Sequence, residues 1–265
     1  MTLRTPTFIL LSALALGGCK QAPVPAGPSP TASTTAATPA LTVAPPVNLA
    51  TAGTISGVVR FDGNPPARIP IDMSADPACK LPYLTEQIVV TDQLLANVYV
   101  YIKSGAPNYA AIPTATAIRL NQKGCRFSPH VIAIQQGGYV TFTNSDPTVH
   151  NIHIMPDQSA NTSTSNSAMD ISQPAGSAPR TQTFSTPEVM LPVRCNNHPW
   201  MSAFINVAPN PWFAISGVDG KFTITGVPPG TYTLAAVHEK LGEQDVQITV
   251  PAKSATQASF TFSAK

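Results

Sequence analysis

The sequence predicts an all-β protein, and three observations lead to this prediction. Proline is frequent, at 28 of the 265 residues, and glycine, threonine and valine recur between the prolines. Short runs alternate apolar and polar side chains, as half-buried strands do. No long stretch shows the 3.6-residue apolar period of an amphipathic helix. We therefore expect many short strands joined by turns.

The first residues predict export. A positively charged start precedes an apolar run from Phe8 to Leu16, which is too short to span a bilayer and fits a secretory signal. The small residues before Cys19 resemble a bacterial lipobox, which implies a signal peptide over 1–18 and lipidation of Cys19. The alternative is an ordinary signal peptide with an incidental cysteine. Because Lys20 follows the cysteine, the resemblance favours a lipid anchor in the cell envelope, on the periplasmic face of the outer membrane.

Residues 19–52 predict a disordered tether, because they are mostly Ala, Pro, Thr, Ser and Val and carry almost no charge. The remaining residues, 53–265, are enough for one large or two smaller all-β domains. Charged residues make up 11% of the chain and the formal net charge is +2, without a basic block. We therefore expect no nucleic-acid partner.

The predicted strands follow in order along the chain. The first is 54–61, ended by Asp-Gly-Asn-Pro-Pro, and 67–87 is expected to be irregular. Further strands are predicted at 87–91, 97–103, 139–144, 189–195, 203–207, 245–250 and 257–262. Hairpins are predicted at 214–224, around an Asp-Gly turn, and at 227–234, around a Pro-Gly turn. Residues 156–182 are polar and predict a long loop. Pro192 predicts that its strand is not central in a sheet, or that it contains a bulge.

The most informative motif runs from Cys195 to Met201. A thiolate, an imidazole (His198) and a thioether occur within seven residues, and these ligands suit copper that alternates between Cu(I) and Cu(II). A second histidine is expected from the segment after residue 144, which offers His150 and His153. These two point to opposite faces of a strand, so only one can serve.

Residues 117–207 resemble the cupredoxins, the small blue-copper proteins, through the Cys-x-x-His-Pro-Trp-Met loop and the His150-Asn151 pair. The loop is most similar to that of the amicyanin- and plastocyanin-like members. This resemblance implies one type 1 copper ion, with His150, Cys195 and His198 as ligands and Met201 as the axial ligand. It also implies a hydrogen bond from Asn151 to the cysteine loop and a solvent-exposed edge on the His198 ring. If that edge is exposed, acid should detach His198 from Cu(I) and raise the reduction potential.

The function implied is transfer of single electrons between redox protein partners by a membrane-tethered protein. Alternatives are a copper-handling protein, an envelope binding or structural module with an ancillary copper site, a zinc site, or a metal-free turn. We do not expect an enzyme, because neither a second histidine cluster nor a hydrolytic triad stands out among the five histidines.

The C-terminal residues 214–250 resemble the carboxypeptidase regulatory-like, or transthyretin-like, β-sandwich through their Asp-Gly-Lys-Phe and Pro-Pro-Gly-Thr-Tyr motifs. That family starts with a strand shaped like residues 55–59. We therefore predict a discontinuous sandwich over 53–113 and 211–265, with a Greek-key cupredoxin domain at 114–210 inserted. The alternative is a tandem or sequential arrangement.

The two remaining cysteines, Cys79 and Cys125, are expected to form a disulfide, because an exported chain folds in an oxidising compartment. The alternative is that one of them joins His130 in a second metal site.

Overall fold

The computed structural model describes residue 48 and residues 50–107, 117–156 and 165–264, which all belong to a single unit, Thr42–Lys265. The signal peptide, Cys19 and nearly all of the tether lie outside the described residues. The described part contains eighteen strands and no helix, which confirms the all-β prediction. Within these same residues no helix meets the length and apolarity that a membrane span requires.

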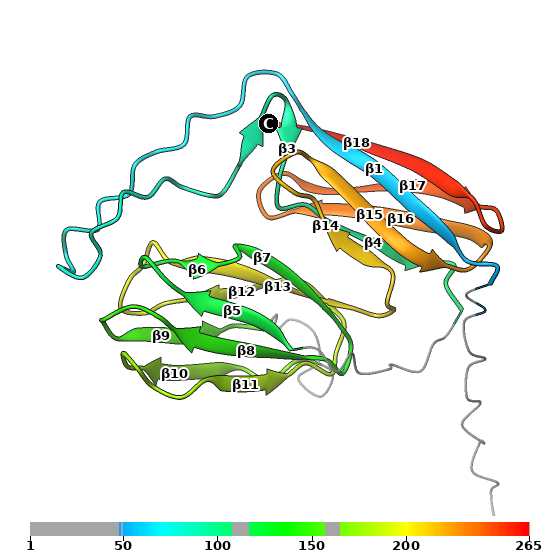
Figure 1. Cartoon of the computed structure of the whole chain (residues 1–265). Helices are drawn as coiled ribbons and strands as arrows, with labels where there is room; N and C mark the ends of the chain where they lie inside the picture. Colours follow the sequence, from blue (N-terminus) through cyan, green and yellow to red (C-terminus); the bar gives the residue numbers. More distant parts are fainter. Residues whose placement is uncertain (1–47, 49, 108–116, 157–164, 265) are drawn as a thin grey trace, which may run out of the picture. The chain divides into compact units, whose positions relative to one another are not determined.

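Strands from the two ends of the described chain share two sheets. In the first, β1 (Gly53–Asp62) pairs in parallel with β18 (Ala255–Ser263) and antiparallel with β15 (Lys221–Val227), so the blue and red strands run side by side in Figure 1. The short strands β3 (Leu94–Leu95) and β2 (Val90–Thr91) extend that sheet. The second sheet has the order β14 (Phe213–Ile215), β4 (Tyr99–Ser104), β16 (Gly230–His238), β17 (Gly242–Val250).

These two sheets enclose an apolar core. Along β1 every second side chain is buried, as expected for a strand with one face on the core. Trp212, Phe61 and Phe262 are among the largest fully buried side chains. Gly57 allows β1 and β18 to approach closely, because a Cβ there would lie 1.7 Å from the carbonyl oxygen of Ala258.

The central residues form a second pair of sheets. One has the order β10 (Met169–Gln173), β9 (His150–Ile154), β12 (Glu188–Arg194), β13 (Ser202–Ala208), β7 (Val131–Gln135). The other has the order β11 (Arg180–Thr183), β8 (Tyr139–Asn144), β5 (Ile118–Gln122), β6 (Phe127–Ser128). Their buried side chains form one shared core, so this region is a β-sandwich. The exact domain boundaries stay predictions.

Pro192 occupies a central strand, so the prediction of a non-central strand was wrong and the bulge alternative is the correct one. β12 lies between β9 and β13. The register shifts between Glu188 and Leu191, where Met190 has a positive φ of 52° and its N–H donates to Asn206 Oδ1 at 2.9 Å. At the bulge, the Met190 N–H is therefore bonded to a side chain and not to the backbone of the neighbouring strand.

The segment 64–89 has no regular strand, and one isolated bridge joins Pro70 to Leu84. Met73, Cys79 and Tyr83 in this segment are buried in the core of the central sheets. Cys79 forms the predicted disulfide with Cys125, which lies between β5 and β6. The alternative, a second metal site with His130, is wrong, because both cysteines are consumed by the bridge.

Candidate metal centre

The loop that joins β12 to β13 carries Cys195, His198 and Met201. Cys195 follows β12 directly, and Met201 immediately precedes β13. Two backbone hydrogen bonds close the loop: Cys195 N–H donates to the Met201 carbonyl at 3.3 Å, and Met201 N–H donates to the His198 carbonyl at 2.9 Å. All three side chains are buried. The loop is therefore a tight turn that presents its side chains to the core.

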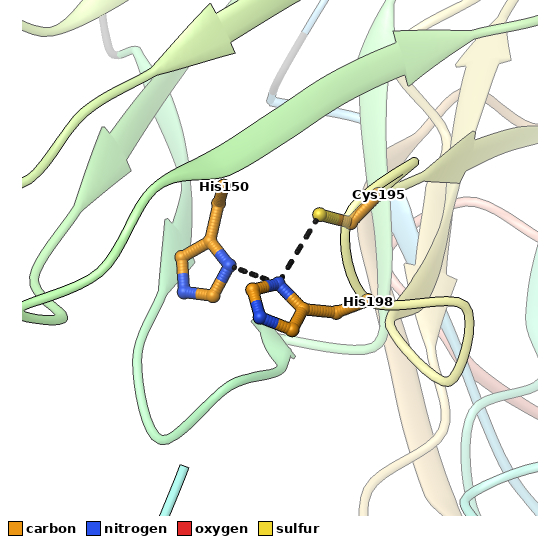
Figure 2. A group of neighbouring side chains, drawn as sticks. All are labelled: His150, Cys195 and His198. Atoms are coloured by element: carbon orange, nitrogen blue, oxygen red, sulfur yellow. Dashed lines mark hydrogen bonds between the residues drawn. The ribbon is translucent and has the colours of Figure 1, made fainter. Parts of the chain in front are cut away.

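His150, the first residue of β9, meets this loop. Its Nδ1 lies 2.9 Å from Nδ1 of His198, and Cys195 Sγ lies 3.6 Å from the same His198 atom. Figure 2 shows the three side chains converging from two separate segments. Ligand atoms of all three lie within 4.8 Å of one another. The structure thus brings together three of the four residues that the sequence predicts as ligands, and it buries the fourth, Met201, in the same core.

His153 is excluded from this cluster. It pairs with Arg194 across the strands, is partly exposed, and its Nδ1 faces Asn196 Oδ1 at 2.8 Å. The strand alternation that separates it from His150 is the one expected from the sequence.

Asn151 holds the cysteine, as the sequence resemblance implies. Its backbone N–H donates to Cys195 Sγ at 3.2 Å, and its side-chain oxygen accepts from the Asn196 N–H at 3.3 Å. The Asn151 amide group also donates to Asp170 at 2.7 Å. Because this side chain joins β9, β10 and the loop, it fixes where the sulfur lies.

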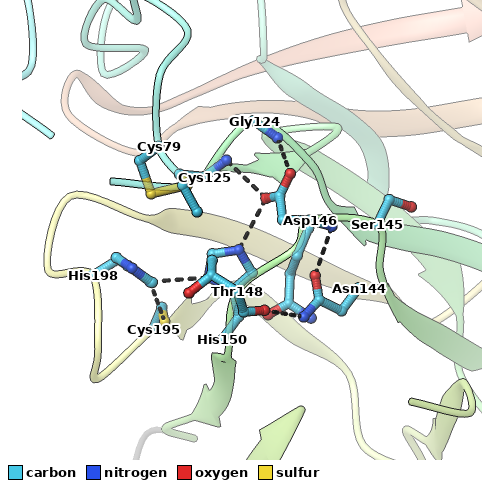
Figure 3. A network of polar contacts seen from close by, with 12 residues as sticks. Cys79, Gly124, Cys125, Asn144, Ser145, Asp146, Thr148, His150, Cys195 and His198 are labelled. Carbon is cyan, nitrogen blue, oxygen red and sulfur yellow. Dashed lines mark hydrogen bonds and ion pairs between the residues drawn. A yellow bond between two sulfur atoms is a disulfide. The ribbon is translucent and has the colours of Figure 1, made fainter. Parts of the chain in front are cut away.

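Two aspartates that the sequence did not single out face the outer nitrogens of the two histidines. His150 Nε2 lies 2.9 Å from Asp146 Oδ2, and His198 Nε2 lies 2.9 Å from Asp76 Oδ2. Figure 3 shows the Asp146 contact together with its anchors. Asp146 lies four residues before His150, which is a usable signal. Asp76 is distant in sequence, and only the nearby Cys79–Cys125 bridge indicates its position.

Backbone groups hold Asp146 in place. The N–H groups of Gly124 and Cys125 donate to its carboxylate at 2.7 and 2.8 Å. Both donor residues have positive φ, 67° and 54°. Successive N–H groups in this conformation form a concave anion site, which here receives a carboxylate.

Asp76 is held by its own surroundings. Its carboxylate accepts from the Thr148 hydroxyl at 2.7 Å and from the Ala78 N–H at 2.8 Å. These two bonds, followed by the His198 ring, lower the pKa of Asp76 to about 2. The group is therefore a carboxylate at neutral pH.

The expectation of a solvent-exposed His198 edge was wrong. Only 3% of this residue is exposed, because Asp76 in segment 64–89 covers its Nε2. The expected acid detachment of His198 depended on that exposure and loses its basis. An open pocket of about 310 Å³ still borders the ring, lined by Ala75, Asp76, Pro77, Thr148, Val149 and Asn197.

The donor set fits a metal ion. When each Nε2–H donates to its aspartate, both Nδ1 lone pairs face each other across 2.9 Å, and that arrangement requires a proton or a cation between them. Burial lowers the pKa of His150, despite the opposing effect of Asp146, so a proton is disfavoured there. Two imidazoles and a thiolate favour a soft or borderline metal such as copper.

No protein-family model and no curated protein sequence matches this chain. Among solved structures, it is similar to a copper-containing nitrite reductase from Thermus scotoductus, with 21% identity and a TM-score of 0.29 over 40% of this chain and 25% of the reductase. It is also similar to a reduced Cu(I) form of an amicyanin variant, with 20% identity and a TM-score of 0.30 over 41% of this chain and 97% of amicyanin. An oxidised amicyanin variant matches with 19% identity over the same shares, also with a TM-score of 0.30. The argument for copper therefore comes from the cluster of His150, Cys195 and His198 in this chain and not from these matches.

Proposed function

We propose that this chain is a membrane-tethered type 1 copper protein that carries single electrons between redox protein partners in the cell envelope. The observation that supports it most is the buried convergence of His150 Nδ1, His198 Nδ1 and Cys195 Sγ. Two imidazoles, one thiolate and a thioether are the ligands of a blue-copper site, and Met201, which is buried in the same core as Cys195, would supply the thioether.

In this proposal the chain binds one copper ion, which supplies a one-electron Cu(II)/Cu(I) couple. The residues around it keep the ligands fixed in both oxidation states: backbone hydrogen bonds close the loop, and Asn151 holds the sulfur. Little rearrangement is then needed when an electron arrives or leaves. A partner would approach the pocket beside His198, and the hydrogen bond from His198 to the partly exposed Asp76 offers a route for the electron.

The remaining parts of the proposal concern location and architecture. Residues 1–18 would direct export, the lipid on Cys19 would anchor the chain at the periplasmic face of the outer membrane, and 19–52 would be the tether. The sheets that join 53–104 to 213–263 would be the transthyretin-like sandwich, interrupted by the copper domain. We propose no catalytic activity for the chain.

The visible absorption spectrum of the protein loaded with Cu(II) tests the proposed site. We expect an intense blue band that disappears on reduction, and we expect Cys195→Ser to abolish it because the thiolate is the donor of that transition. His153→Gln is the matched control, since it changes a partly exposed histidine on β9, the strand that carries His150. Colourless protein with one equivalent of Cu(II) bound would defeat the proposal.

Copper exchange distinguishes an electron carrier from a copper-handling protein. Because the ligands are buried and held on both sides, we expect slow transfer of Cu(I) to an excess of a chelator and a reversible one-electron couple. Rapid exchange without a reversible couple would favour copper handling instead.

A further inference from the structure

In each histidine of the proposed site, the Nε2 atom faces an aspartate carboxylate, while Nδ1 faces the other histidine. The distances are equal, 2.9 Å for His150 Nε2 to Asp146 and 2.9 Å for His198 Nε2 to Asp76. The histidine side chains are 0% and 4% exposed, and the aspartates 9% and 21%. These contacts are therefore largely shielded from water, where a hydrogen bond to a charged group is stronger than at an exposed site.

The two carboxylates come from different parts of the chain, yet one disulfide anchors both. Asp76 lies three residues before Cys79, and the Cys79 N–H donates to the Asp76 carbonyl at 2.9 Å. The Cys125 N–H donates to Asp146. Because Cys79 and Cys125 are bonded, the disulfide joins the two segments that hold these aspartates against the histidines.

We propose that Asp76 and Asp146 are positioning residues that lower the reduction potential of the copper site. This inference rests on the proposed function. Each carboxylate keeps the proton on Nε2, so that the Nδ1 lone pair is directed inward, and it makes the imidazole a stronger donor. Each also places a negative charge near the ion. Both effects stabilise Cu(II), which carries the larger charge, more than Cu(I).

The same contacts keep His198 in place after reduction. A histidine with an exposed edge can rotate away from Cu(I), whereas here Asp76 holds the outer nitrogen and Trp200 lies against the ring, with centroids 5.2 Å apart. Trp200 is itself fixed by donating its indole N–H to the Cys125 carbonyl at 3.1 Å. The disulfide region therefore holds both sides of the His198 ring.

The test is a redox titration of the copper-loaded full chain, followed by its visible band, for Asp76→Asn and Asp146→Asn. Asparagine preserves the size of the side chain and removes its charge. We expect each change to shift the ratio of Cu(II) to Cu(I) affinity about tenfold towards Cu(I), which is a rise of about 59 mV for a one-electron couple. Asp76→Glu, which keeps the charge, should restore most of the original potential.

Asp72→Asn is the matched control. Asp72 lies in the same segment, and its carboxylate accepts from the Ser74 N–H at 2.9 Å, away from the histidines. We expect the ratio of Cu(II) to Cu(I) affinity in Asp72→Asn to stay within about twofold of the ratio in the unmodified protein. Equal shifts in Asp72→Asn and Asp76→Asn would overturn the inference, because the effect would then be one of general charge.

A second measurement distinguishes loss of one histidine–aspartate contact from misfolding of the variant. In the Cu(I) form, proton NMR should show two slowly exchanging imidazole Nε2–H signals, one of which disappears in each asparagine variant while the fold is retained. Unchanged potentials with both signals present would overturn the inference and leave the blue site intact. Absence of the Cys195-dependent blue band in the unmodified protein would instead overturn the proposed function.

Discussion

The two pairs of sheets in this chain differ in what they bury. In the sheets built from 53–104 and 213–263, buried polar groups are used to hold the backbone: Ser216 Oγ accepts from the Val98 N–H and donates to the Leu95 carbonyl. In the central sheets, His150 and His198 are buried with their Nδ1 atoms facing each other. The comparison teaches that burial of polar groups does not by itself indicate function. The convergence of two imidazoles and a thiol in one buried cluster does indicate it.

The largest loss of stability is expected from a change in the apolar core between the sheets built from 53–104 and 213–263. Trp212 is 2% exposed, and its indole N–H donates to the Gly226 carbonyl at 2.8 Å. Trp212→Ala should lower the free energy of unfolding by about 3–5 kcal/mol, because it leaves a cavity and an unpaired carbonyl. Chemical denaturation measures the loss. The blue band of the folded variant should be unchanged, and a changed band would show that the two regions are coupled.

Removal of the disulfide should weaken the central region. The bridge joins residues 46 positions apart, so the double variant Cys79→Ser, Cys125→Ser should lose about 4 kcal/mol of stability through the entropy of the unfolded chain. Denaturation of the metal-free protein measures this loss. Cys195→Ser is the control, since it also replaces a buried sulfur with oxygen but keeps the bridge. A loss no larger than in that control would contradict the prediction.

Acid should weaken the chain through His238, a buried residue of β16. Burial, and then the nearby charges of His130 and Lys240, lower its pKa to about 4. The unfolded chain binds this proton near pH 6.5, so the unfolded state takes up more protons between about pH 6.5 and 4 and stability falls as the pH falls through that window. The loss should be about 3 kcal/mol at most.

The variant His238→Gln tests this pH dependence. It should flatten the curve of unfolding free energy against pH between about 6.5 and 4, because glutamine takes up no proton there. His153→Gln, at a partly exposed position, is the control. An unchanged curve in His238→Gln would show that other groups cause the acid loss.

The smallest loss of stability is expected from changes to two buried polar side chains, one in each pair of sheets. Asn151→Ala and Ser216→Ala should each cost about 1–3 kcal/mol, because each leaves buried partners without a hydrogen bond. Only Asn151→Ala should also shift the blue band, since Asn151 connects to the loop that holds the sulfur. A shift of the blue band in both variants, or in neither, would contradict the prediction that only Asn151 influences the copper site.

Much of the site could be predicted from sequence because its ligands are local. Cys195, His198 and Met201 occur in one short loop, and strand alternation separates His150 from His153. The apolar and polar alternation in 54–61 and 139–144 likewise predicts β1 and β8. The disulfide followed from cysteine count and export.

Other features could not be predicted, because they depend on residues distant in sequence. Asp76 lies 122 positions from His198 and reaches it only through the fold, and its contact reversed the expected exposure of that histidine. The sequence also left open whether Pro192 marks a non-central strand or a bulge, and the structure shows a central β12 with a register shift between Glu188 and Leu191.

The sequence by itself determined the strand class, the ligand types and their spacing, since these follow from local periodicity and from side-chain chemistry. Only the tertiary structure decided which groups surround the ligands. It placed a carboxylate behind each histidine and a disulfide between their anchors. The physical reason is that ligand identity is a property of single residues, whereas burial and charge at the site depend on how distant segments pack together.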